Sequence, residues 1–275
     1  MRYTPLKNFL QIYKNALFLG CFISNIVAQS CAHPIKERLH ALMHKKQSNL
    51  ILAADVSTTK ELLKIADECG PAICILKIHV DILEDFDHNF LNELKKLSEK
   101  HEFLIMEDRK FADIGHIARL QYESGIYRIA DWADIIICHA IAGSDSLKEL
   151  FTAAKNYNAG VLLVAQLSSK NNLIDDMYTQ RAYEIATQFD QEIIGFITQR
   201  KFVDDNRFLF IAPGIHNTLN KDTQGQVYHG VSLVIEKNGI DLIVVGRAIL
   251  NSPNPGIAAR QYQIEAWSCL QLRNG

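Results

Sequence analysis

A repeated alternation of apolar and amphipathic segments constrains the fold of this chain more than any other feature. From about residue 49 onward, short runs rich in Ile, Leu, Val and Ala alternate with longer segments that have helical periodicity. The expected strands cover residues 49–56, 72–78, 103–107, 134–139, 161–165, 193–197, 208–212 and 241–245. Helical segments are expected between most of them, over residues 58–68, 89–100, 117–129, 147–156 and 179–188.

The apolar character of these runs predicts an α/β fold with a parallel sheet. Strands that are apolar along their whole length are buried on both faces, with helices outside. About eight strand–helix units in a chain of 275 residues predict a single-domain (β/α)8 TIM barrel, which typically takes ~250 residues. An open doubly wound sheet is the alternative. The sequence has neither a GxGxxG motif after the first strand nor a GxxxxGK[ST] motif, so no common nucleotide fingerprint favours that alternative.

The chain divides into an N-terminal extension over residues 1–31 and a barrel domain over residues 32–275. Residues 15–28 are apolar, follow Lys7 and Lys14, and resemble a weak signal peptide. An amphipathic N-terminal helix and a misassigned start codon are the other interpretations, and all three remain open. The segment is too short to span a bilayer comfortably.

Composition narrows the possible partners and the compartment. The formal net charge is −2, from 29 basic and 31 acidic residues, so no global field attracts nucleic acid or an anionic membrane. The six cysteines form no CxxC pair and no zinc-like spacing, and Cys74 and Cys138 lie in apolar strands as expected for buried free thiols. We therefore expect a cytoplasmic protein that binds neither nucleic acid nor a membrane.

Ionisable residues recur where the expected strands end. In a (β/α)8 barrel these carboxyl-terminal ends meet at one mouth, which holds the active site. Such residues at the first four strand ends are Asp55, Lys77, His79, Asp108, Lys110, Asp113 and His139. A single Asp there is usually a helix cap, a single Lys is usually solvated, and His139 alone is more often structural. Two Lys and three Asp at one mouth, however, indicate a catalytic site.

The signs of these charges decide what the cluster can be. A like-charged pair ~4 Å apart repels by ~4 kcal/mol at an effective dielectric of ~20, so a dense cluster must alternate in sign. Lys77, Asp108, Lys110 and Asp113 can alternate in this way. A metal is the rival use for the acidic and histidine residues, but two interleaved lysines would repel the ion, and we expect no metal.

The loops after the seventh and eighth strands have the character of an anion site. Barrels commonly hold phosphate there with backbone N–H groups and a short helix start. Pro213-Gly214 and Gly246-Arg247 offer close backbone approach and a guanidinium that can bind phosphate through two hydrogen bonds. This pairing favours a phosphorylated substrate.

Taken together, these residues resemble the orotidine 5'-phosphate decarboxylase family, and within it the eukaryotic-type branch. The resemblance extends from about residue 32 to the C-terminus. The motifs that carry it are Asp55-Val56, LKIHVDIL at 76–83, EDRKFADIG at 107–115, Gln121-Tyr122, Trp132-Ala133-Asp134, Leu167-Ser168, Pro213-Gly214, GQVY at 225–228 and IVVGR at 243–247. The DxKxxD core also occurs in sugar-phosphate decarboxylases and aldolases of the same suite, so the other motifs supply the specificity.

The resemblance implies cofactor-free conversion of orotidine 5'-phosphate to UMP at sites shared across a homodimer. It implies that Lys110 donates a proton to C6 of the pyrimidine, that Asp108 and the partner's Asp113 flank it, and that Lys77 completes the charge network. The implied substrate-binding residues are Asp55 and His79 near the ribose and phosphate, Ser168 at the pyrimidine amide, Gln226, Tyr228, Gly246 and Arg247 at the phosphate, and Ile114, Ile117 and Pro213.

The chemistry agrees with that assignment. Loss of CO2 from C6 leaves an electron pair in an in-plane orbital without a conjugated sink. A preorganised cation can stabilise the developing charge, and Lys110 is suited to this. Asp108 facing the substrate carboxylate would disfavour the ground state more than the transition state. Phosphate binding far from C6 can drive loop closure.

The sequence departs from the family pattern at two positions. His116-Ile117 stands where the family usually has Asn-Thr, so the Thr hydroxyl that contacts a ribose hydroxyl across the dimer is absent. A lost hydrogen bond to a buried polar group costs ~1–3 kcal/mol, which predicts weaker binding or slower turnover. Ala53 replaces a common Ser, but bacterial members have Ala there. The alternatives are a magnesium-dependent sugar-phosphate lyase of the same suite and a weakly active nucleotide-binding relative.

Overall fold

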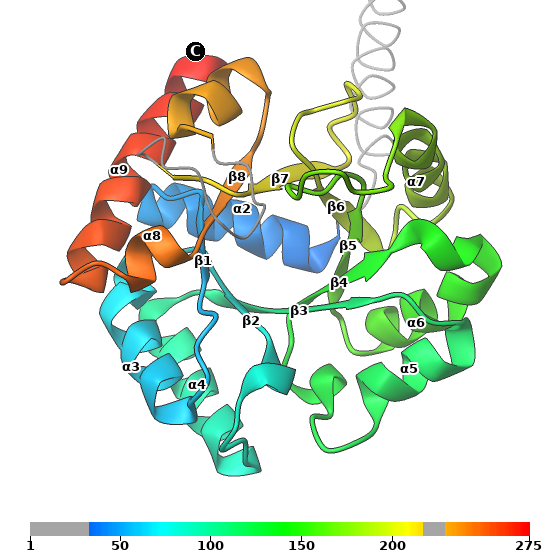
Figure 1. Ribbon diagram of the computed structural model, residues 1–275, viewed down its shortest axis with the longest axis horizontal. Coiled ribbons are helices and arrows are strands. Elements are labelled where there is room, and N and C mark those ends of the chain that lie inside the picture. The colour runs from blue at the N-terminus through cyan, green and yellow to red at the C-terminus, as the bar shows by residue number, and fades with distance from the viewer. Residues whose placement is uncertain (1–32, 217–228) are drawn as a thin grey trace, which may run out of the picture. The chain divides into compact units, whose positions relative to one another are not determined.

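Eight parallel strands close into a barrel in the computed structural model, which describes residues 33–216 and 229–275. Each strand pairs with its neighbours in chain order, and β8 pairs with β1. Figure 1 shows the ring of strands with the helices around it. The strands are β1 (Leu50–Ala53), β2 (Ile75–Ile78), β3 (Leu104–Phe111), β4 (Ile135–His139), β5 (Gly160–Val164), β6 (Ile193–Ile197), β7 (Leu209–Pro213) and β8 (Leu242–Val245). The predicted (β/α)8 fold is confirmed.

The strands are buried on both faces, as their apolar sequences require. Every residue of β1, β2, β5, β6 and β8 is buried. The α-helices are α2 (Pro34–Lys46), α3 (Thr59–Cys69), α4 (His88–His101), α5 (Gly115–Glu123), α6 (Gly143–Asn156), α7 (Asp176–Gln188), α8 (Arg247–Leu250) and α9 (Pro255–Asn274). Short helical turns also follow β2 (η2, Val80–Ile82) and β4 (η4, Ala140–Ala142).

Side-chain caps fix where several helices begin. Thr58, Asp87 and Asp175 each accept a hydrogen bond from a backbone N–H in the first turn of α3, α4 and α7. Such caps satisfy amide groups that have no partner inside the helix. They place the starts of these helices within a few residues of the expected boundaries.

The structure also differs from the expected elements. The helix expected over 117–129 ends at Glu123, because Gly125 takes a left-handed conformation (φ +69°) that breaks it. Residues 198–208, between β6 and β7, contain no helix. β3 extends to Phe111 rather than ending at residue 107. These differences lie where loops, rather than periodic segments, decide the path.

Helix α2, which the periodicity left unassigned, closes the amino-terminal end of the barrel (Figure 1). Lys36 donates to the carbonyls of Asn206 and Arg207 before β7, and Lys46 donates to those of Gly70 and His101 before β2 and β3. Leu39 and Met43 of α2 are buried against the core. The opposite, carboxyl-terminal mouth is therefore left for a ligand.

Two further observations concern cysteines and membranes. Cys74 and Cys138 are free and buried, as predicted. Within residues 33–216 and 229–275, no helix has both the length and the apolarity needed to cross a membrane. The extension over residues 1–31 lies outside the described residues.

Candidate active site

Two neighbouring strands position most of the charged residues at the carboxyl-terminal mouth. Lys77 lies on β2, and Asp108 and Lys110 lie on β3. The β3–β4 register shifts between Glu107 and Phe111, and Lys110 has a left-handed backbone conformation (φ +53°). A bulge of this kind re-aims a side chain and is common beside active sites.

Four side chains at this mouth form a chain of alternating charge. Lys77 Nζ lies 3.1 Å from Asp55 Oδ1 and 2.8 Å from Asp108 Oδ2. Lys110 Nζ lies 2.7 Å from Asp108 Oδ1. His79 Nε2 joins at 3.2 Å from Asp108 Oδ2. Within one chain the order is Asp55–Lys77–Asp108–Lys110, so Asp55 contacts Lys77 directly.

The pKa directions follow from this geometry. Burial by itself would raise the pKa of Asp108, but Lys77, His79 and Lys110 outweigh it and hold that pKa well below its usual range. Burial by itself would lower the pKa of Lys77, but Asp108 and Asp55 outweigh it and raise that pKa. Both groups therefore stay charged in a buried setting, which preorganises a strong electric field at the mouth.

A cavity of about 250 Å³ joins this network to the ends of β7 and β8. Its walls include Asp55, Lys77, His79, Asp108, Lys110, Pro213, Gly214, Gly246 and Arg247. Gly246 precedes the first turn of α8, and a Cβ there would approach Ala53 at 3.3 Å. The cavity thus has a lysine–aspartate end and an end with backbone amides and a guanidinium.

Asp113 and Ile114 lie outside that cavity. They line a more open hollow of about 590 Å³ beside β3, together with Lys110 and Ile141. Asp113 accepts a hydrogen bond from the N–H of Ile114 and is exposed. Ile117, on α5, is 38% exposed. In the single chain Asp113 is therefore not part of the network around Asp108.

Three other expected ligand-binding residues are not described at the cavity around Asp108. Ser168 is half-buried in the loop after β5 and lines neither the cavity around Asp108 nor the open hollow beside β3. Gln226 and Tyr228 fall in residues 217–228, outside the described part of the chain. Their expected contacts with the base and the phosphate stay predictions.

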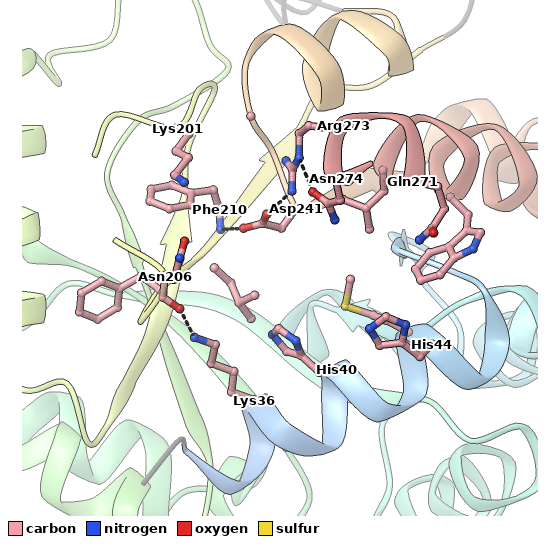
Figure 2. Close-up of a pocket in the computed structure, with 16 residues that line it drawn as sticks. Lys36, His40, His44, Lys201, Asn206, Phe210, Asp241, Gln271, Arg273 and Asn274 are labelled. Carbon is pink, nitrogen blue, oxygen red and sulfur yellow. Dashed lines mark hydrogen bonds and ion pairs between the residues drawn. The ribbon is translucent and has the colours of Figure 1, made fainter. Parts of the chain in front are cut away.

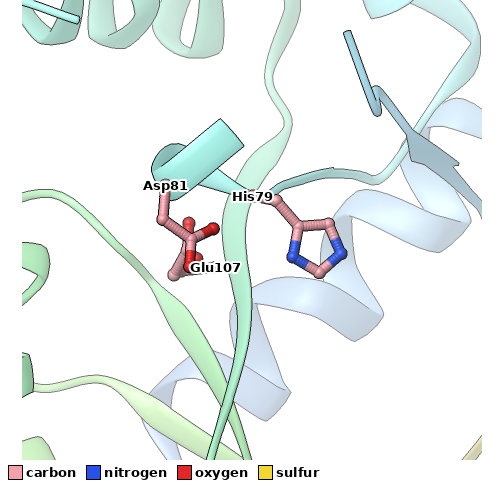
Figure 3. A group of neighbouring side chains, drawn as sticks. All are labelled: His79, Asp81 and Glu107. Atoms are coloured by element: carbon pink, nitrogen blue, oxygen red, sulfur yellow. The ribbon is translucent and has the colours of Figure 1, made fainter. Parts of the chain in front are cut away.

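One group of side chains among the described residues has the spacing of a metal site. The ligand atoms of His79, Asp81 and Glu107 lie within 4.8 Å of one another (Figure 3). The expected rival ligands Asp55 and Asp108 are instead paired with lysines. Lysine ammonium groups lie on both oxygens of Asp108 and on one oxygen of Asp55, where they compete with any cation.

A separate cavity of about 500 Å³ lies at the opposite, amino-terminal end of the barrel. Figure 2 shows Lys36, His40 and His44 of α2 facing Asp241 and Arg273 across it. Arg273 already pairs with Asp241 at 2.8 Å, and Lys36 donates to two backbone carbonyls. Since (β/α)8-barrel enzymes bind and convert their substrates at the carboxyl-terminal mouth, this cavity is not the catalytic one.

The fold and the mouth together define a (β/α)8-barrel enzyme with a lysine–aspartate centre. Residues 48–262 match the model of the "Orotidine 5'-phosphate decarboxylase / HUMPS family". The chain therefore belongs to that family, as the resemblance predicted.

Individual relatives agree with this assignment. The chain is 45% identical over 241 residues to uridine 5'-monophosphate synthase of Bos taurus, covering 88% of this chain and 50% of the bovine protein. It thus spans about half of that relative. It is 42% identical to orotidine 5'-phosphate decarboxylase of Rhizomucor pusillus, covering 87% of this chain and 93% of the relative. The orotidine 5'-phosphate decarboxylase structure from Pyrococcus horikoshii superposes with a TM-score of 0.59 at 24% identity, covering 81% and 99% of the two chains, and supports the fold.

Proposed function

We propose that this protein is a carboxy-lyase that converts orotidine 5'-phosphate to UMP without a cofactor. The observation that carries the proposal is Lys110 Nζ, 2.7 Å from Asp108 Oδ1 at the mouth of a barrel of this family. The cavity they border continues to Gly246 and Arg247, which suit a phosphate. A pyrimidine nucleotide would thus have its base at one end and its phosphate at the other.

The reaction requires one bond to break and one proton to move. The C6–carboxylate bond breaks, CO2 leaves, and the electron pair stays on C6. The Lys110 ammonium stabilises that charge and transfers its proton to C6, forming the C–H bond of UMP. Asp108 holds the ammonium in place, and Lys77 on its other oxygen holds Asp108 (2.8 Å). Because these ions are fixed before the reaction, little reorganisation is needed as charge develops.

The remaining contacts follow from the same pose. Asp55 and His79 would bind the ribose side, and Ser168 the pyrimidine amide. Pro213, Gly246 and Arg247 would bind the phosphate together with Gln226 and Tyr228. Ile114 and Ile117 would border the partner's site.

We also propose that the active unit is a cytoplasmic homodimer whose barrel domain covers residues 32–275, behind the extension over 1–31. Asp113 lies beside exposed Ile114 and Ile141 (62% and 68% exposed), a surface suited to a second copy of the chain. Asp113 of one subunit would then reach the Lys110 centre of the other. The buried free thiols support a reducing compartment.

The test is an absorbance assay of orotidine 5'-phosphate turnover with purified protein, with and without EDTA. We expect turnover that EDTA leaves unchanged, and a loss of at least ~10³-fold in kcat for Lys110→Ala. Lys155→Ala, which removes only a surface ion pair with Glu192, is the control. Activity retained in Lys110→Ala would refute the mechanism. Activity lost with EDTA would favour the magnesium-dependent lyase.

A further inference from the structure

A buried carboxyl group lies directly behind the charge network. Glu107 precedes Asp108 on β3 and is 0% exposed. Its Oε2 accepts a hydrogen bond from the N–H of Val80 at 3.1 Å. Within the described residues, its Oε1 has no hydrogen-bond partner. Because adjacent strand residues point to opposite faces, Glu107 points away from the mouth that Asp108 faces.

The neighbours of Glu107 connect it to the site. Asp81 and His79 each bring a side-chain atom within 4.8 Å of it and of each other (Figure 3). Asp81 pairs with Arg109 of β3 at 3.2 Å, and His79 Nε2 lies 3.2 Å from Asp108 Oδ2. Two residues of β3 therefore contact the turn η2: Glu107 accepts from the N–H of Val80, and Arg109 pairs with Asp81.

An ionised Glu107 would be costly in this position. Burial is the largest effect on the pKa of Glu107 and raises it. The Val80 N–H and Lys77 lower this pKa, Asp81 and Asp108 raise it, and the net result is a rise to about 8. A proton on Oε1 would turn this oxygen into a donor, and the Asp81 carboxylate and the His79 ring offer acceptor atoms within 4.8 Å of the Glu107 carboxyl group. That proton removes both the repulsion and the unpaired buried oxygen.

We propose that Glu107 is a positioning residue whose protonated carboxyl holds η2, and with it the His79 ring, against Asp108. It touches neither substrate nor reacting atoms and acts through His79. Its effect on turnover rests on the proposed decarboxylation, whereas its effect on stability does not. A cation bound by His79, Asp81 and Glu107 is the competing account, and nearby Arg109 and Lys77 oppose it.

The first measurement compares kcat/KM from about pH 6 to about pH 9 for the wild type, Glu107→Gln and Glu107→Leu. Glu107→Leu should lower kcat/KM roughly 10- to 100-fold near neutral pH. Because Gln reproduces the shape and the donor of a protonated Glu, Glu107→Gln should keep most of the wild-type kcat/KM. Above pH about 8 the wild type should lose activity relative to Glu107→Gln, because only the wild type then gains a buried charge. Parallel profiles for the wild type and Gln would refute the proposal.

The second measurement follows Tm against pH and needs no substrate. The pKa of Glu107 rises from 4.5 to about 8 on folding, so between these values the folded state binds more protons than the unfolded state. Wild-type stability then falls as pH rises through this window. The Tm of Glu107→Gln relative to the wild type should therefore increase with pH by a few degrees. Glu93→Gln, an exposed carboxylate on α4, is the control.

The two measurements separate the possible failures. If orotidine 5'-phosphate is not turned over, the Tm series still tests the proton on Glu107. A Tm difference that does not vary with pH refutes the proposal. If EDTA lowers the Tm of the wild type but not that of Glu107→Gln, the three side chains hold a cation and the proton account is wrong.

Discussion

At the residue scale, Lys110 carries the proposed catalytic ammonium group on a backbone with an unfavourable conformation. Its φ of +53° lies in the left-handed region, where a Cβ crowds the following carbonyl. Such a conformation costs of order 1–3 kcal/mol in a residue other than Gly and persists only where its surroundings impose it. Here the ion pair with Asp108 and the shifted register of β3 hold it.

This backbone strain can be measured by comparing two truncations. We expect Lys110→Gly to be more stable than Lys110→Ala by about 1 kcal/mol in urea unfolding, because Gly takes a positive φ without a Cβ penalty. Both variants lose the ammonium, so the comparison isolates the backbone. At exposed Lys148, in the middle of α6, the order should reverse, since Gly destabilises a helix by roughly 0.5–1 kcal/mol relative to Ala. Equal stability of the two Lys110 variants would contradict the strain.

At the element scale, the start of α5 lies between β3, which carries Asp108 and Lys110, and helix α6. A Cβ at Gly115 would overlap the carbonyl oxygen of Ser146 on α6, so only Gly allows the two helices to approach this closely. That contact fixes the direction of α5 and leaves Ile117 on its exposed side. The usual Thr at this position would present its hydroxyl at the same point of the surface.

Restoring that hydroxyl should improve the enzyme. We expect Ile117→Thr to raise kcat/KM by roughly 5- to 150-fold, which corresponds to a regained hydrogen bond of ~1–3 kcal/mol. Leu120→Thr is a matched control, because Leu120 lies on the same helix and, like Ile117, is 38% exposed. No gain for Ile117→Thr, or an equal gain for both variants, would count against a cross-subunit contact at residue 117.

At the scale of the whole molecule, the proposed site is incomplete in the single chain. Asp113 lies on the open hollow rather than beside Asp108, and the surrounding Ile114 and Ile141 are exposed. A two-fold dimer would cover these side chains and supply each site with the partner's Asp113. The proposed homodimer therefore explains both an exposed apolar surface and an absent carboxylate.

Mixing two inactive variants tests the shared site. Lys110→Ala and Asp113→Ala should each be inactive alone, but subunit exchange would create one intact site per mixed dimer. An equimolar mixture should regain about a quarter of wild-type activity, because half of the dimers are mixed and one of two sites in each is intact. Lys110→Ala mixed with Asp108→Asn should regain nothing, since both residues belong to one chain's network. No recovery in the first mixture would refute sharing.

The sequence by itself determined the barrel, because burial on both faces leaves a largely apolar run in most strands. It also determined the strand ends that carry chemistry and the family, because these are recorded in residue type and motif spacing. Tertiary structure alone decided that Asp55 contacts Lys77 and that Lys110 has a left-handed backbone. It also decided that α2 closes the far end of the barrel and that Glu107 lies buried behind His79. These features arise from contacts between segments far apart in the chain and from backbone angles set by a neighbouring strand. Residue type and periodicity record neither.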